Sequence, residues 1–181
     1  MDSEKRQRYQ STMVSTYSPN TSFLNFVVIP DNEQQAPYPN LLDMLRSGVT
    51  SVVNSRRRNG LIIFKRYHAE FAGPGAVIGG DYDLDCHGVI PIGNLSILTT
   101  DSHEESQKAY LIRRQWIRLI KQITEHPIPN QRVRKILDQF DQYFPSDIVS
   151  HLPDEAFALL VGVLPQTVNS VRCPGNKFKN S

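Results

Sequence analysis

Three aspartates spaced two residues apart, Asp81, Asp83 and Asp85, have the residue type and spacing of calcium ligands. A calcium loop built on them also needs glycine at its sixth position and a bidentate glutamate at its twelfth. This chain has Cys86 and Ile92 at those positions. We therefore predict no calcium site, and we interpret the alternation of polar and apolar residues here as a strand with one acidic face exposed.

The two cysteines of the chain, Cys86 and Cys173, offer little for catalysis or metal binding. Cys86 and the adjacent His87 are one pair of zinc-ligand types, but no second pair follows at zinc spacing. Nothing in the sequence marks a partner that would activate Cys86 as a nucleophile, so a structural cysteine is the better interpretation. The glycines of 73–80 match neither a phosphate-binding loop nor a dinucleotide fingerprint. We predict a protein without enzymatic activity, metal or cofactor.

The charged residues are segregated along the chain, although the net charge is only +2. Residues 56–66 carry five positive charges and no negative one, 67–107 carry seven acids and no Lys or Arg, and 108–135 carry eight basic residues against one acid. This pattern suits an anionic partner, either nucleic acid or a membrane surface, or a self-association in which acidic and basic faces meet. For 108–135, a solvated outer helix face is an equally good interpretation. The residues expected to bind nucleic acid or membrane are Arg56, Arg57, Arg58, Lys65, Arg66, Arg113, Arg114, Arg118, Lys121, Arg132, Arg134 and Lys135.

The length of 181 residues and the apolar content of 39% are sufficient for one domain with a buried core. No run approaches the ~18 uncharged apolar residues of a membrane span. The N-terminus lacks the apolar core of a signal peptide. Two cysteines cannot form a disulfide scaffold, so we expect reduced thiols and a location in the cytosol or nucleus.

The N-terminal half mixes strand and helix patterns, and we expect an α+β core over 21–100 with a small mixed or antiparallel sheet and one helix. Asn59-Gly60 predicts a turn inside this core. The expected elements are a disordered arm at 1–20, a buried strand at 23–29, a helix at 41–54, a strand at 61–71, the acidic strand at 81–87 and a strand at 89–98 that is either an edge strand or bulged.

The C-terminal half has helical periodicity throughout. Ser102 and Glu105 form a capping box that begins a helix, which Pro127 ends. A second apolar stripe after an Asn130 cap stops at Pro145. Two shorter helices follow at 154–161 and 165–171. We expect a helical subdomain over 101–172 packed on the core, and a flexible tail over 173–181, which makes the fold class α+β.

Residues 154–171 fit a helix-turn-helix. Ala158 is small where two helices must touch, Gly162 falls at the turn, and Val168 is apolar on the second helix. This stretch resembles the C-terminal region of Crp/Fnr-type regulators, although a packed pair of short helices gives the same pattern. The resemblance implies contacts with duplex DNA by Gln166, Thr167, Asn169 and Arg172.

A second resemblance covers roughly residues 20–100. A basic arm leads to an aromatic strand, a Pro/Tyr loop, an amphipathic helix, a basic link and a hydrophobic strand, and then to the run Tyr82–Pro91. This order is similar to the core of rhabdovirus matrix proteins, especially the short ones of plant-infecting members. In addition, Tyr38-Pro39-Asn40-Leu41 fits the Tyr-Pro-x-Leu form of viral late-domain motifs.

The matrix resemblance implies a non-enzymatic structural protein of the virion and host cytoplasm, with the nucleus as a second location. Such a protein would bind nucleocapsid or RNA, lie peripherally on an anionic membrane and form a homo-oligomer. The late-domain motif implies the host budding machinery as a further partner. The alternative hypothesis is a transcriptional regulator that binds duplex DNA through 154–171.

Overall fold

The structure is a computed structural model that describes residues 40–174. Six strands within these residues form two antiparallel three-stranded sheets, ordered β4-β1-β6 and β3-β2-β5. The strands are β1 (Thr50–Val53), β2 (Asn59–Phe64), β3 (Ala69–Ala72), β4 (Val77–Gly79), β5 (Gly88–Gly93) and β6 (Ile97–Leu98). The helices are α1 (Leu41–Arg46), α2 (His103–Thr124), α3 (Pro129–Tyr143), α4 (Ser146–His151), α5 (Asp154–Val161) and α6 (Pro165–Arg172), with a 3-10 turn, η1 (Gly80–Tyr82).

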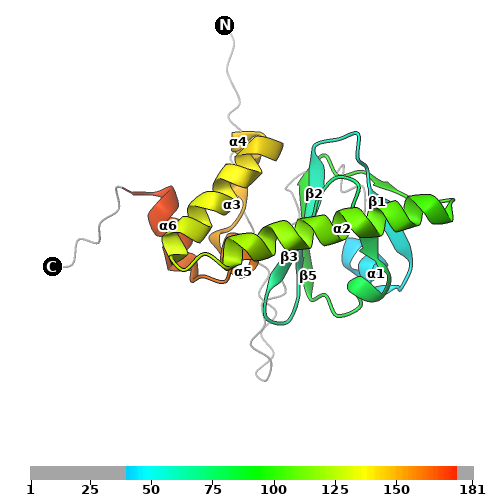
Figure 1. Cartoon of the computed structure of the whole chain (residues 1–181), viewed down its shortest axis with the longest axis horizontal. Coiled ribbons are helices and arrows are strands. Elements are labelled where there is room, and N and C mark those ends of the chain that lie inside the picture. Colours follow the sequence, from blue (N-terminus) through cyan, green and yellow to red (C-terminus); the bar gives the residue numbers. More distant parts are fainter. Residues whose placement is uncertain (1–39, 175–181) are drawn as a thin grey trace, which may run out of the picture.

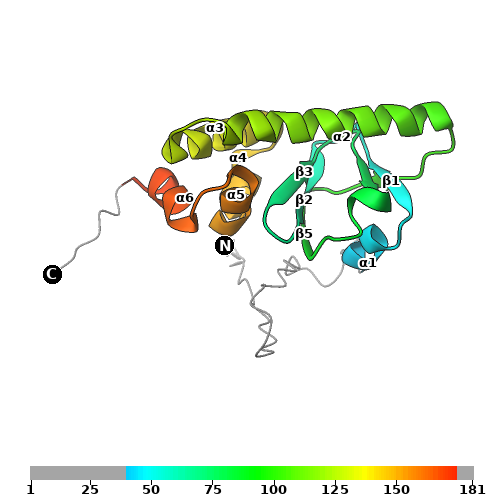
Figure 2. The same cartoon turned by 60° about the horizontal axis from the view of Figure 1, so that its bottom comes forward.

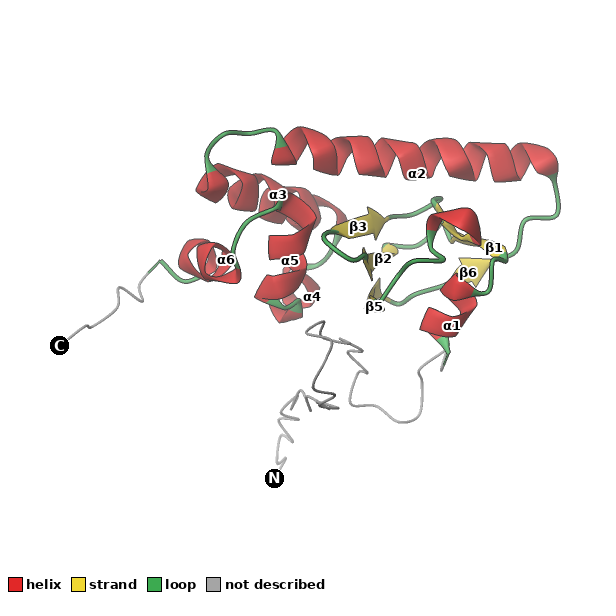
Figure 3. Cartoon of the chain, turned by 90° about the horizontal axis from the view of Figure 1, so that it is seen from below, coloured by secondary structure: helices red, strands yellow, loops and turns green. Residues whose placement is uncertain are grey.

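Helix α2 is the longest helix of the described structure, and it crosses the sheet half and reaches the C-terminal helices (Figure 1). Its 22 residues extend about 33 Å at 1.5 Å per residue. The strands lie between α2 and α1 (Figure 2). Helices α3 to α6 lie together at the C-terminal end of α2 (Figure 3). The hydroxyl of Ser102 accepts a hydrogen bond from the Glu105 backbone N–H at 3.1 Å, which confirms the predicted start of this helix.

Strand β2 is buried on both faces, because it lies between two hydrophobic cores. Ile62 and Phe64 face the core shared with the C-terminal helices, whereas Leu61 and Ile63 face the core shared with α1 and the second sheet. The alternation follows from the period of two along a strand. Trp116 of α2 packs against both cores, so α2 contributes to the core on each face of β2.

A cluster of aromatic rings joins the sheet to the helices. The Phe71 ring lies 5.0 Å from Trp116, 5.0 Å from Phe140 and 5.9 Å from Phe144, measured between ring centroids. Phe140 also meets Phe157 of α5 at 5.2 Å. Rings at these separations and steep angles attract one another in addition to burying apolar area.

The α+β class, with antiparallel sheets and a helical C-terminal half, is confirmed. The predicted helices at 154–161 and 165–171 match α5 and α6 to within one residue. The strand predicted at 89–98 is divided between β5 and β6, and both are edge strands, as Pro91 and Gly93 indicated. Within residues 40–174, no helix combines the length and the apolar character needed to cross a membrane.

Two predicted elements each turn out to be a pair. The helix predicted at 41–54 ends at Arg46, because Gly48 has φ +78° and the β-branched residues after it form β1. The strand predicted at 61–71 is the hairpin β2–β3, closed by a hydrogen bond from the Lys65 N–H to the His68 carbonyl at 2.8 Å. In both cases one continuous apolar pattern covers two elements that are joined by a turn.

Three further expectations are wrong. The acidic strand predicted at 81–87 is η1 followed by turns, and Asp83 in it is fully buried. Asn59-Gly60 begins β2 instead of forming a turn, because the chain turns at 55–58, just before this strand. Helix α3 begins after Ile128 with Pro129 in its first turn, so Asn130 is not its cap, and α4 was not expected.

Several expected elements lie outside the described residues. These are the arm at 1–20, the strand at 23–29, the motif residues Tyr38 and Pro39, and most of the tail at 173–181. Leu41 of the same motif is described and lies buried in α1, where it packs in the core.

We predict that Phe140→Ala lowers the free energy of unfolding by about 3–5 kcal/mol, because it leaves a cavity at the centre of the aromatic cluster. Phe140 is only 2% exposed. Leu164→Ala, at a side chain 68% exposed, is the control and is expected to change stability by less than about 0.5 kcal/mol. Urea unfolding of the three proteins measures both effects, and equal losses in the two variants would contradict this account of the core.

Candidate nucleic-acid interface

The structure divides the twelve basic residues singled out in the sequence into three groups by burial. Nine are exposed: Arg56, Arg57, Arg58, Arg66, Arg114, Arg118, Lys121, Arg134 and Lys135. We had expected Lys65 and Arg113 to belong to an exposed basic surface. This expectation is wrong, because both side chains are buried. Arg132 is half-buried, and its guanidinium donates to the carbonyls of His126 and Gly162.

Arg113 is the largest fully buried side chain among the described residues, with 0% exposure. Its Nη2 donates to Glu70 Oε2 at 2.6 Å and lies 3.2 Å from Asp83 Oδ1. Its Nη1 lies 3.4 Å from the Val77 carbonyl, while its Nε has no partner in the described structure. A buried charge is tolerated only when opposite charges and hydrogen bonds replace its water. These contacts therefore explain why Arg113 points inward from α2.

Lys65 extends the same buried network. Its Nζ lies 2.6 Å from Asp85 Oδ1 and 3.3 Å from Asp83 Oδ1, and it also donates to the Tyr82 carbonyl. The other oxygen of Asp83 accepts the Gly79 backbone N–H at 2.8 Å. Two of the aspartates singled out in the sequence thus serve as counter-ions for Lys65 and Arg113. We call Lys65, Glu70, Asp83, Asp85 and Arg113 the ion cluster.

Burial and neighbouring charges shift the pKa of Glu70, a member of the ion cluster, and the pKa of Cys86, which follows Asp85 in the chain. Burial alone raises the pKa of the Glu70 carboxyl, but the charge and hydrogen bonds of Arg113 outweigh it, and the pKa falls below its ordinary 4.5. Burial raises the pKa of the Cys86 thiol, and the nearby Asp83 raises it further. Cys86 is therefore a neutral thiol at neutral pH, which is unsuited to nucleophilic attack.

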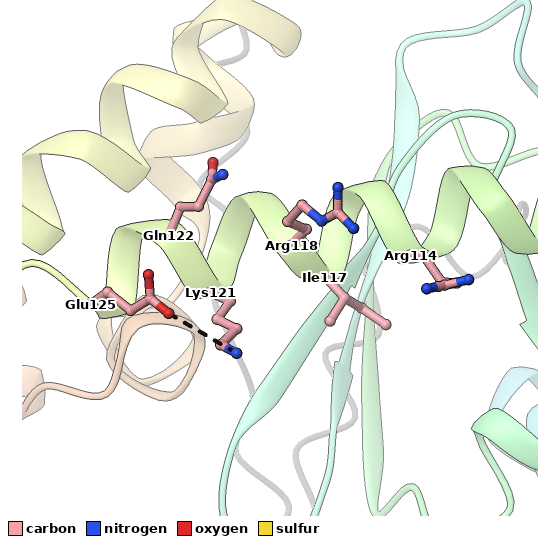
Figure 4. Close-up of a pocket in the computed structure, with 6 residues that line it drawn as sticks. All are labelled: Arg114, Ile117, Arg118, Lys121, Gln122 and Glu125. Atoms are coloured by element: carbon pink, nitrogen blue, oxygen red, sulfur yellow. Dashed lines mark ion pairs between the residues drawn. The ribbon is translucent and has the colours of Figure 1, made fainter.

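Three exposed basic side chains, Arg114, Arg118 and Lys121, follow one another along α2 (Figure 4). They line a shallow hollow of about 390 Å³ together with Ile117. At 1.5 Å per residue, the first two are about 6 Å apart along the axis and the next step is about 4.5 Å. Lys121 also faces Glu125 at 4.0 Å, but both side chains are largely exposed. We call these three residues the α2 basic face.

A second hollow, of about 480 Å³, lies between the β2–β3 turn, α2 and α5. Tyr67 and His68 line it from the turn, and Leu159 lines it from α5. Ile117 and Lys121 line both hollows, so the second is continuous with the α2 basic face. Sequence reasoning missed Tyr67, because only the hairpin turn brings it beside a helix about 50 residues later in the chain.

The remaining exposed basic residues stand on other elements. Arg56, Arg57 and Arg58 lie in the turn between β1 and β2, and Arg134 and Lys135 lie on α3. Neither hollow includes any of them. The twelve predicted residues thus do not form one site, and the α2 basic face is the group that the structure gathers around a hollow.

Two of the four residues of the alternative DNA-binding hypothesis, Asn169 and Arg172, form hydrogen bonds within the protein. Arg172 donates to Asp154 Oδ1, to the Leu152 carbonyl and to the Val149 carbonyl, each at 2.7 Å. Asn169 donates to Asp154 Oδ2 at 3.2 Å. Gln166 is exposed and Thr167 is half-buried. Arg172 and Asn169 therefore hold α6 against its neighbours.

Comparisons with protein-family models, with curated proteins and with solved structures find no match to this chain. Within residues 40–174, no three His, Cys, Asp or Glu side chains are placed to hold a metal ion. The candidate site is therefore defined by its own geometry, namely the α2 basic face and the hollow that continues from it.

We predict that Arg113→Met lowers the free energy of unfolding by about 3–5 kcal/mol, because it leaves Glu70 without its buried counter-ion and Asp83 with Lys65 alone. Arg114→Met makes the same chemical change one residue along, on the exposed side of α2. We expect this control to shift stability by less than about 0.5 kcal/mol. Chemical denaturation at pH 7 measures both, and a stable Arg113→Met protein would show that the ion cluster is dispensable.

The lowered pKa of Glu70 predicts a pH dependence of stability. The folded state binds this proton less readily than the unfolded state, so the ion pair stabilises the fold above about pH 4.5 and is lost as the pH falls through the folded pKa. Glu70→Gln should be less stable than the wild type at pH 7, and the difference should shrink below about pH 4.5. Urea unfolding between pH 7 and 3 tests this, and a constant difference across the range would refute it.

Proposed function

We propose that this chain is a non-enzymatic structural protein of matrix type that binds the RNA of a nucleocapsid through the α2 basic face. The observation that carries the proposal is the exposure of Arg114, Arg118 and Lys121 on one helix. Among the described residues, no carboxylate lies within ion-pair distance of either arginine, and Glu125 approaches Lys121 only to 4.0 Å. Three cations without strong internal partners are free to meet an anionic polymer.

The chemistry of this contact is phosphate neutralisation. Lysine and arginine displace the counter-ions of a nucleic acid, and the release of those ions drives binding without regard to sequence. An arginine guanidinium can also donate two parallel hydrogen bonds to one phosphate.

The distribution of charge along α2 supports self-association. Asp101, Glu104 and Glu105 are exposed at its start, whereas Arg118 lies about 21 Å further along the axis from Glu104. A contact between the start of one α2 and the basic face of another is heterologous and can continue into an open polymer. In this proposed contact, the acidic start of α2 supplies the acidic face in place of the strand that the sequence predicted at 81–87.

Membrane attachment rests on a different group of residues. Arg56, Arg57 and Arg58 are all exposed in one turn, and near an anionic membrane each is worth roughly 1 kcal/mol. Attachment of this kind is peripheral, which agrees with a protein of the virion and host cytoplasm. The DNA-regulator hypothesis remains the alternative, and we place it second because two of its four contact residues, Arg172 and Asn169, bond within the chain.

We predict that the triple variant Arg114→Gln, Arg118→Gln, Lys121→Gln binds random single-stranded RNA more weakly than the wild type. The log–log salt dependence of binding should fall by about 0.7 per lost contact, or about two in total. Lys108→Gln, at an exposed lysine near the acidic start of α2, is the control and should retain binding. Fluorescence anisotropy from about 50 to 500 mM salt measures both slopes.

The outcomes separate the hypotheses. Equal binding by the triple variant and the wild type would remove the α2 basic face from the proposal. A preference for particular duplex DNA sequences would favour the regulator instead. A wild-type protein that binds neither RNA nor anionic liposomes would reject the matrix proposal.

A further inference from the structure

We infer that the ligand of the α2 basic face is single-stranded nucleic acid, and that Tyr67 is a platform on which one of its bases stacks. This inference rests on the proposed function and names the form of the nucleic acid. It depends on Tyr67 and on the hollow that joins this residue to α2.

Tyr67 has no packing role that accounts for its position. It is 75% exposed, more than any other large hydrophobic side chain among the described residues. Exposure of this size leaves ring surface open to a ligand, and a tyrosine ring can stack on any base. Arg66 places its guanidinium carbon 5.2 Å from the centre of the ring, so a cation accompanies the aromatic group.

The turn that carries Tyr67 is held firmly on both sides. Lys65 N–H bonds the His68 carbonyl at 2.8 Å across the turn, and the Lys65 side chain is fixed in the ion cluster. His68 Nε2 lies 3.3 Å from Glu70 Oε1. The exposed ring is thus presented from an anchored hairpin, which lowers the entropy lost when a base stacks on it.

The two hollows adjoin at Ile117 and Lys121, and we treat the lining that leads from the cations to the aromatic ring as one track. Arg114 and Arg118 line the first, Tyr67 lines the second, and Lys121 lines both. The second hollow also has apolar lining residues from α2 and α5, which suits the flat face of a base. Two acids line the track, and each faces a cation: Glu70 meets Arg113 at 2.6 Å, and Glu125 meets Lys121 at 4.0 Å.

A track of this composition selects a single strand over a duplex. In a duplex the base faces are covered by neighbouring bases, so an external tyrosine has nothing to stack on. In a single strand the bases can turn away from the backbone while the phosphates follow the basic side chains. Removal of one stacking residue typically weakens binding by about 5- to 150-fold.

The test uses the full chain with labelled oligo-U, oligo-dT and a random duplex, each about 12 nucleotides or base pairs long to fit one binding site, measured by fluorescence anisotropy. Tyr67→Leu keeps an apolar side chain without the ring, and we expect at least about fivefold weaker binding to both single strands and less than about a twofold change on the duplex. Tyr67→Phe keeps the ring and should bind within about twofold of the wild type. Thermal unfolding of each variant reports whether the fold is retained.

A Tyr67→Trp variant supplies a readout independent of affinity. Stacking of a base on the introduced indole should quench its fluorescence when oligo-U is added, beyond any change seen in wild-type protein, whose single tryptophan is Trp116.

Unchanged binding by Tyr67→Leu, or no added quenching in Tyr67→Trp, overturns the stacking inference. If the triple variant of the α2 basic face loses binding in the same experiment, the proposed function stands without the stacking inference. Equal weakening of duplex and single-strand binding by Tyr67→Leu also overturns the inference, because the ring would then act on the backbone contact. Failure of the wild type to bind any of the three probes rejects both proposals.

Discussion

The guanidinium of Arg113 has no contact with solvent, so its charge must be neutralised inside the protein. Glu70 and Asp83 supply the opposite charges, and they come from the β2–β3 hairpin and the loop after η1. One buried side chain therefore joins three separate parts of the chain. Successive residues of a helix differ by about 100° around its axis, so the inward direction of Arg113 also turns Arg114 outward. The orientation of the candidate site follows from the internal ion pair.

The same constraint organises the β2–β3 turn. Lys65 points inward to Asp83 and Asp85, while Arg66 and Tyr67, its next neighbours along the chain, are exposed. Adjacent basic residues thus have opposite roles, one structural and one available for binding. The ion cluster holds α2 and the turn beside one another, and this is why Tyr67 and Lys121 line one hollow although they are far apart in the sequence.

Local patterns predicted α2, α5 and α6 well, but they misplaced α1, missed α4 and misassigned several strands. The start of α2 follows from Ser102 bonding the Glu105 N–H, and Gly162, with φ +65°, separates α5 from α6, so both boundaries depend on neighbouring residues. The alternation at 81–87 has the period of a strand, yet burial does not follow it. Asp83 is fully buried against Lys65 and Arg113, which are distant in the chain, whereas the apolar Leu84 is 51% exposed.

The sequence by itself determined the α+β class, the segregation of charge, the start of α2 and the boundaries of α5 and α6, because each depends on composition or on residues within one helical turn. Only the tertiary structure decided which basic residues are available to a partner. Arg113 and Arg114 are adjacent residues of the same type, yet one is a buried counter-ion and the other an exposed cation. The difference lies in Glu70, 43 residues before Arg113, which comes within 2.6 Å of it only when the hairpin packs under α2. Long-range pairing of charges is a property of the fold, and no local pattern encodes it.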